Sequence, residues 1–169
     1  MNKYMRELYF EADTRKHQQL VAQCLLAVAK DLMDRAVKHD ASKFSEYEKP
    51  FYVDPVYELN HSDIKYGSTE YQKLTGIMGE GWKHHSVNND HHIEFFVPYS
   101  VQTLNDPIRA MDLFSLVEMV CDWIAASKRK GNEPHMALEQ LHKEFSIDEQ
   151  LQAIIRNTLN MIERRAFKV

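Results

Sequence analysis

The sequence contains few cysteines, glycines and prolines. Its 169 residues include 2 cysteines, 5 glycines and 5 prolines, which excludes a disulfide scaffold and a collagen-like chain. Lys and Arg number 21 against 25 Asp and Glu, and the formal net charge is −4. Because no basic block is present, we expect no non-specific binding to nucleic acid.

Long apolar runs are also missing. The longest one, residues 24–29, is far too short to span a membrane, so no membrane partner is expected. The first ten residues carry charges throughout and lack the apolar segment of a signal peptide. We therefore expect a reducing, cytoplasmic location, with Cys24 and Cys121 as small core residues.

Helical periodicity is what the chain does have. Apolar residues recur every three or four positions in several segments, which predicts helices over residues 14–37, 68–85, 107–130, 135–145 and 147–165. Asp106 and Pro107 are typical of a helix cap and first position. Residues 46–68 are richer in Pro, Tyr and Asn and predict irregular structure or short broken helices. The sequence thus predicts an all-α protein with a single domain over residues 1–169.

Nine histidines are the unusual count in the composition. His39 and Asp40 are adjacent, and two histidine pairs stand on either side of an Asn-Asn-Asp turn: His84-His85 and His91-His92. Neutral imidazoles and carboxylates are the usual ligands of catalytic Zn, Mn, Fe and Co. The ordered series, which ends at Asp122, therefore predicts a metal site. Helix periodicity does not choose within the pairs, since the two first members and the two second members are equally spaced.

This series resembles the HD-domain superfamily of metalloenzymes. His17 matches its first histidine, His39-Asp40 the doublet that names it, Lys43 the HDxxK version of the motif, and Asp122 the last aspartate. The stretches KHDASKFS, YGSTEY, HHSVNNDHHIE and EMVCDW are similar to a group of small bacterial and phage HD-like proteins of unknown function. The resemblance covers most of a core at residues 14–130 and leaves the C-terminal helices, residues 131–169, outside it.

The resemblance implies an HD-type helical bundle around one or two divalent ions. It implies these ligands: His17, His39, Asp40, His85, His91, His92 and Asp122. It favours His85 over His84 but leaves His91 and His92 unresolved, and Asp40 could bridge two ions. If residues 17–39 formed one straight helix, His17 and His39 would lie roughly 33 Å apart and could not share an ion. Either the chain turns, which we expect near residues 30–34, or His17 is not a ligand.

Four further residues are candidate catalytic groups. Lys43 could neutralise a phosphate oxygen, and Glu94 could act as a general base or orient a ligating histidine. Glu118 and Arg129 recur on the same helix face as Asp122 and could reach the same cavity.

The function expected from the resemblance is metal-dependent phosphohydrolysis of a nucleotide or another small phosphate ester. The residues do not specify the ion among Mn, Co, Mg, Zn and Fe. Two alternatives remain: an HD-fold di-iron oxygenase, and a non-catalytic helical module with a structural metal. Because HD proteins often dimerise, the resemblance also implies a homodimer as one expected assembly.

Overall fold

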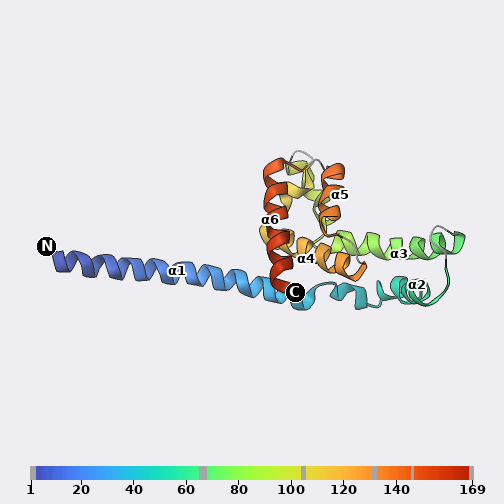
Figure 1. The fold of residues 1–169 in the computed structure, drawn as a ribbon, viewed down its shortest axis with the longest axis horizontal. Helices are drawn as coiled ribbons and strands as arrows, with labels where there is room; N and C mark the ends of the chain where they lie inside the picture. The colour runs from blue at the N-terminus through green and yellow to red at the C-terminus, as the bar shows by residue number, and fades with distance from the viewer. Residues whose placement is uncertain (1–2, 65–67, 104–105, 131–132, 146, 168–169) are drawn as a thin grey trace. The chain divides into compact units, whose positions relative to one another are not determined.

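The computed structural model describes residues 3–64, 68–103, 106–130, 133–145 and 147–167. Every regular element in these ranges is helical, which confirms the all-α prediction. Where the sequence predicts one domain, the structure divides the chain into two units, Met1–His39 and Asp40–Val169 (Figure 1).

The first unit is a single helix, α1 (Lys3–Lys38), in which no residue is buried. Ion pairs one turn apart along the helix, such as Lys30–Asp34 and Arg35–Asp31, support it locally. Of the two alternatives, the turn near residues 30–34 is wrong, because α1 continues through this region; the alternative that His17 is not a ligand remains. No Gly or Pro interrupts the helix there, so nothing in the local sequence breaks its hydrogen bonds.

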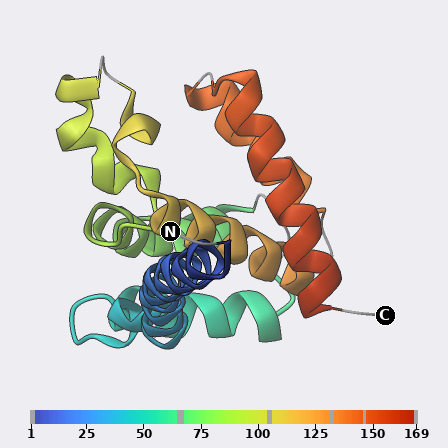
Figure 2. The ribbon, with the colours of Figure 1, turned by 90° about the vertical axis from the view of Figure 1, so that its left-hand side faces the viewer.

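The second unit consists of short and medium helices. In chain order these are η1 (Ala41–Phe44), α2 (Lys49–His61), α3 (Thr69–Asn88), η2 (Ile93–Thr103), η3 (Pro107–Ala110), α4 (Leu113–Lys130), α5 (His135–Phe145) and α6 (Glu149–Ala166). Helix α2 packs against α3, and α6 packs against both α4 and α5 (Figure 2). The apolar core lies mainly between α4, α5 and α6, where Val120, Ile124, Leu138, Ile155 and Leu159 are almost fully buried.

Two predicted segments differ from the structure. The segment expected to be irregular or to hold short broken helices contains one helix, α2, of 13 residues. Pro50 lies in its first turn, where no backbone donor is needed, and the helix continues past the buried Pro55 although that residue has no N–H to donate. The helix expected over residues 107–130 is broken before Leu113. Asp106 does accept from the backbone N–H of Ile108 as a cap, but Asp112 caps a second start, α4.

Helices α2 and α3 approach each other closely at Gly81. A Cβ atom at this position would lie only 2.7 Å from Cβ of Phe51, so the packing requires glycine here. Ser68 caps the N-terminus of α3, since its Oγ accepts from the N–H of Tyr71. The close packing places the C-terminal end of α3, with its histidine pair, beside the segment that precedes α2.

The structure also bears on the burial of the two cysteines and on whether a helix could span a membrane. Cys24 and Cys121 are both exposed, so their prediction as core residues is wrong. Among the helices described, none combines the length and apolar character needed to cross a membrane.

Candidate metal centre

Asp40 opens the second unit with an unusual backbone conformation. Its φ is 58° and its ψ 10°, and it is the only residue other than glycine with a positive φ in the described ranges. Asp tolerates this left-handed region better than most residues, and such conformations are common at functional sites. The carboxylate of Asp40 does not cap η1 but faces the histidines of the following elements.

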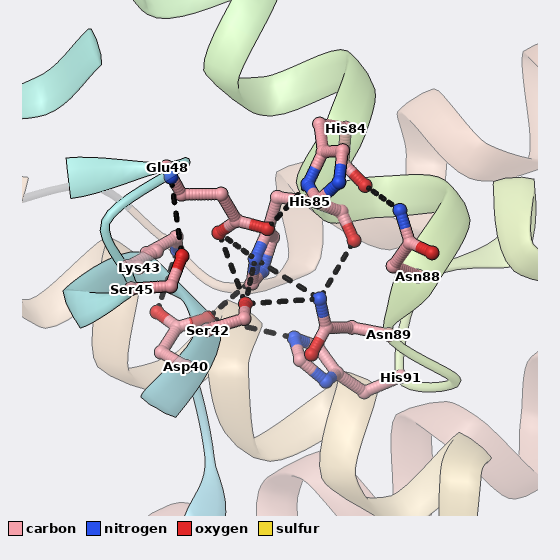
Figure 3. Close-up of polar contacts among 10 residues, drawn as sticks. All are labelled: Asp40, Ser42, Lys43, Ser45, Glu48, His84, His85, Asn88, Asn89 and His91. Atoms are coloured by element: carbon pink, nitrogen blue, oxygen red, sulfur yellow. Dashed lines mark hydrogen bonds and ion pairs between the residues drawn. The ribbon is translucent and has the colours of Figure 1, made fainter. Parts of the chain in front are cut away.

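Three buried histidines meet Asp40. His85 lies near the end of α3, and His91 and His92 lie in the turn between α3 and η2. Nε2 of His85 is 3.0 Å and Nε2 of His91 is 3.7 Å from Oδ1 of Asp40 (Figure 3). One nitrogen or oxygen from each of these four residues lies within 4.8 Å of the others. Three imidazoles and a carboxylate at this spacing are a donor set that suits a transition metal ion.

His92 provides a test of whether the group fits a metal ion. Its Nε2 is buried and has no hydrogen-bond partner in the described part of the chain. Burial, followed by the neighbouring His91 and His85, lowers the pKa of His92 to about 3, so the ring is held neutral. A buried, neutral imidazole nitrogen without a protein partner is the form that binds a metal ion. The residues therefore fit an ion at this place.

Glu48 lies directly behind His85 on the side away from Asp40. Its side chain is completely buried. Its carboxylate accepts from Oγ of Ser42 at 3.0 Å, and lies 2.8 Å from Nδ1 of His84 and 3.1 Å from Nδ1 of His85 (Figure 3). Burial acts to raise the pKa of Glu48, but these contacts with His84, Ser42 and His85 outweigh it and lower the pKa.

Helix α4 contributes carboxylates on the opposite side of the group. Oε1 of Glu118 is 3.3 Å from Nδ1 of His91, and a carboxylate oxygen of Asp122 lies within 4.8 Å of a His91 ring nitrogen. Oγ of the buried Ser115 donates to Oδ2 of Asp90 at 3.2 Å, which ties the histidine turn to α4. Glu118 thus contacts the ring nitrogen of His91 that points away from Asp40.

Lys43 forms an ion pair with the carboxylate of the group. Its Nζ lies 2.6 Å from Oδ2 of Asp40, and both side chains are half-buried. Burial acts to raise the pKa of Asp40, but contacts with His85, His91 and Lys43 together hold it well below the ordinary value. Asp40 is therefore ionised and able to act as a ligand.

A comparison with protein families shows to which family the chain belongs. The family described as "Family of unknown function (DUF5662)" matches residues 6–161. The chain belongs to this family. The match includes the residues of the candidate centre and extends past the predicted core into α5 and α6. Comparisons with curated proteins and with solved structures found no match.

In this DUF5662 chain the structure brings together only part of the predicted ligand set. Asp40, His85, His91 and His92 form the group, and Asp122 lies beside His91. His17 is exposed in the middle of α1, and the unbroken helix puts it roughly 33 Å from His39 at ~1.5 Å per residue. The two therefore cannot share an ion, which corrects the shared ligation implied by the resemblance. His39 is the last residue of the first unit, and its role as a ligand stays a prediction.

The predicted catalytic residues are also divided. Lys43 and Glu118 contact members of the group. Arg129 is exposed near the end of α4, and its place in a cavity shared with Glu118 stays a prediction. Glu94 is half-buried at the start of η2, and its role stays a prediction.

Sequence reasoning missed Glu48 and its neighbours Ser42 and Asn89. The amide of Asn89 lies 3.1 Å from Oγ of Ser42 and donates to the backbone oxygen of His85 at 2.8 Å. Ser42 lies inside the HDxxK stretch, which was a signal for attention to that segment. Nothing in the charged surroundings of Glu48 marks it as buried, since Glu46 and Lys49 on either side are exposed.

Proposed function

We propose that Asp40, His85, His91 and His92 hold a divalent metal ion, and that the protein is a metal-dependent phosphohydrolase. The observation that carries the metal site is the convergence of three imidazoles on one carboxylate oxygen, with Nε2 of His92 buried and without a hydrogen bond in the described residues. The hydrolase activity is supported by the resemblance of the HDxxK stretch to HD-domain enzymes.

The residues around the group suit hydrolysis of a phosphate ester. A divalent ion, when bound, lowers the pKa of water and polarises a phosphoryl oxygen. Lys43, half-buried and paired with Asp40, supplies a positive charge that can attract a phosphate oxygen. Asp122, close to His91, can accept a proton or serve as a further ligand. A nucleotide or another small phosphate ester is the proposed substrate class.

Metal content tests the site. Wild-type protein purified without a histidine tag should retain Mn, Co, Zn or Fe by elemental analysis. Asp40→Asn and His92→Ala should lose most of it, whereas His142→Ala, which changes an exposed histidine of α5, should retain it. Wild-type metal content in both site variants would refute the ligand assignment. His17→Ala and His39→Ala test whether the first two histidines of the HD-like series contribute ligands to the ion.

Activity distinguishes the proposed reaction from its alternatives. Phosphate release from a panel of nucleotides and small phosphate esters, stimulated by Mn, Co or Mg and lost in Asp40→Asn, supports hydrolysis. Two irons with oxygen-dependent turnover would instead support the oxygenase. A tightly held ion without turnover on any phosphate ester would support a structural metal and reject the hydrolase.

A further inference from the structure

Glu48 has an environment that its place in the sequence does not explain. It precedes α2, between exposed neighbours, yet its side chain has no solvent exposure. Its two carboxylate oxygens face only polar groups: the hydroxyl of Ser42, Nδ1 of His84 and Nδ1 of His85 (Figure 3). Burying a carboxylate is unfavourable unless it is well paired, so this arrangement requires all three partners.

The chemistry of these contacts determines where the proton of His85 lies. An ionised carboxylate only accepts hydrogen bonds, so a proton on Nδ1 of His85 is directed at Glu48. Nε2 of His85 lies 3.0 Å from Oδ1 of Asp40, a second ionised carboxylate, inside the candidate metal centre. When an ion is bound there, Nε2 can offer it a lone pair while Nδ1 keeps its proton.

The neighbouring donors agree with this assignment. The amide nitrogen of Asn89 can donate to both Oγ of Ser42 and the backbone oxygen of His85, while the Ser42 hydroxyl donates to Glu48. Oγ of Ser42 and the amide nitrogen of Asn89 also lie 2.9 Å and 3.1 Å from Nδ1 of His85. With the amide protons on Oγ of Ser42 and the backbone oxygen, and the hydroxyl proton on Glu48, neither group needs Nδ1 as an acceptor, and Nδ1 keeps its proton for Glu48. A consistent network of this kind fixes the ring orientation as well as the tautomer.

We propose that Glu48 is a positioning residue of the metal centre: its buried carboxylate holds His85 with the proton on Nδ1 and presents Nε2 to the ion. This inference rests on the metal site of the proposed function. His84 is then not a ligand but a second donor to the same carboxylate, which assigns different roles to the two adjacent histidines. Glu118 makes the corresponding contact with Nδ1 of His91, so two of the three imidazoles are backed by a carboxylate.

Carboxylates behind metal-bound histidines set the orientation and basicity of the ring, and their removal typically weakens metal affinity 10–100-fold. Glu48→Gln keeps the size of the side chain but replaces one accepting oxygen by a donor. The neighbouring Glu46→Gln removes the same charge from an exposed position and is the matched control.

The first measurement is the affinity for Co²⁺, by spectroscopic titration against a competing chelator. Glu48→Gln should bind Co²⁺ about 10–100-fold more weakly than wild type and show a changed visible absorption spectrum, while Glu46→Gln matches wild type. Equal affinity and spectrum in Glu48→Gln would overturn the positioning role and leave the metal site standing. Wild-type protein that binds no Co²⁺ would overturn the metal site itself.

The second measurement needs no variant, and so it applies even where Glu48→Gln does not fold. Two-bond ¹H–¹⁵N correlation spectra of the Zn²⁺-loaded wild-type protein distinguish protonated, unprotonated and metal-bound ring nitrogens. His85 should show its proton on Nδ1 and no proton on Nε2. A proton on Nε2, with Nδ1 unprotonated, would overturn the inference.

Discussion

Replacing Gly81 by alanine should destabilise the protein, whereas the same change at Gly79, on the same helix, should stabilise it. A Cβ atom added at Gly81 would lie 2.7 Å from Cβ of Phe51 and 3.1 Å from Cε2 and Cζ of Tyr52. At Gly79 no atom outside the helix backbone lies within 4 Å of the added Cβ. The two variants therefore differ in one respect, the contact between α3 and α2.

The magnitude follows from these distances. In both variants alanine improves the helix by about 0.5–1 kcal/mol relative to glycine. At Gly81 the new contact is roughly 1 Å shorter than the optimal ~3.5–4.0 Å between carbon atoms. Because the Cβ of Phe51 is attached to the backbone of α2, the helix itself must move, at a cost of about 1–3 kcal/mol. The helix term cancels between the variants, so their stabilities should differ by about 1–3 kcal/mol.

Thermal and urea unfolding of the two variants and wild type measure this difference. For a chain of this size 1 kcal/mol shifts Tm by about 2–4 °C, so Tm of Gly81→Ala should be about 2–12 °C below that of Gly79→Ala. Equal Tm values for the two variants would refute the close approach of α2 and α3. The placement of Glu48 behind His85 would then also lose its support, because the same helix pair positions both residues.

Three further changes test the buried polar groups. Tyr52→Phe should raise the free energy of unfolding by about 1 kcal/mol in urea titrations, because its hydroxyl is buried without a hydrogen bond in the described chain; a decrease would reveal a partner. In the presence of a metal chelator, lowering the pH from 7 to 5 should reduce the free energy of unfolding of wild type by about 2 kcal/mol more than that of His92→Leu. Burial, then His91 and His85, lowers the folded pKa of His92 from 6.5 to about 3, so the unfolded state takes up the proton first, and this stability is lost as pH falls from about 6.5 towards 3; parallel pH profiles would contradict it. At a free Zn²⁺ concentration of 100 times Kd, wild type should gain about 2.7 kcal/mol by calorimetry and His92→Leu much less; equal gains would exclude His92 as a ligand.

Helix type and several helix ends follow from local sequence. The caps at Ser68 and Asp106 were predictable because each cap is satisfied by neighbours in the chain. The break before α4 was not, since Asp106 and Asp112 both offer a cap and only tertiary packing decides how far each helix extends. The turn expected in α1 had no sequence signal of its own and was inferred solely to bring His17 to His39.

The candidate site was predictable in kind but not in membership. Helix periodicity can match His84 with His91, or His85 with His92, only if one helix contains both pairs. Helix α3 ends at Asn88, before the second pair. His91 and His92 therefore lie in a turn, where adjacent side chains can reach the same point, and both join the group. His84 and His85 do lie on a helix, where adjacent residues point about 100° apart. His85 faces Asp40, and both histidines contact Glu48.

The charges around the group bear on how an ion would affect stability. The carboxylates of Asp40, Glu48, Glu118 and Asp122 surround the three imidazoles, and none of the four side chains is exposed. Lys43 is the ammonium group paired with Asp40, and His92 is neutral because its pKa is lowered to about 3. Glu48 is fully buried and the other three are partly buried, and carboxylates taken out of water are unfavourable unless they are paired. A divalent ion held by Asp40 and the histidines would be one such partner, so metal binding and folding stability should rise and fall together.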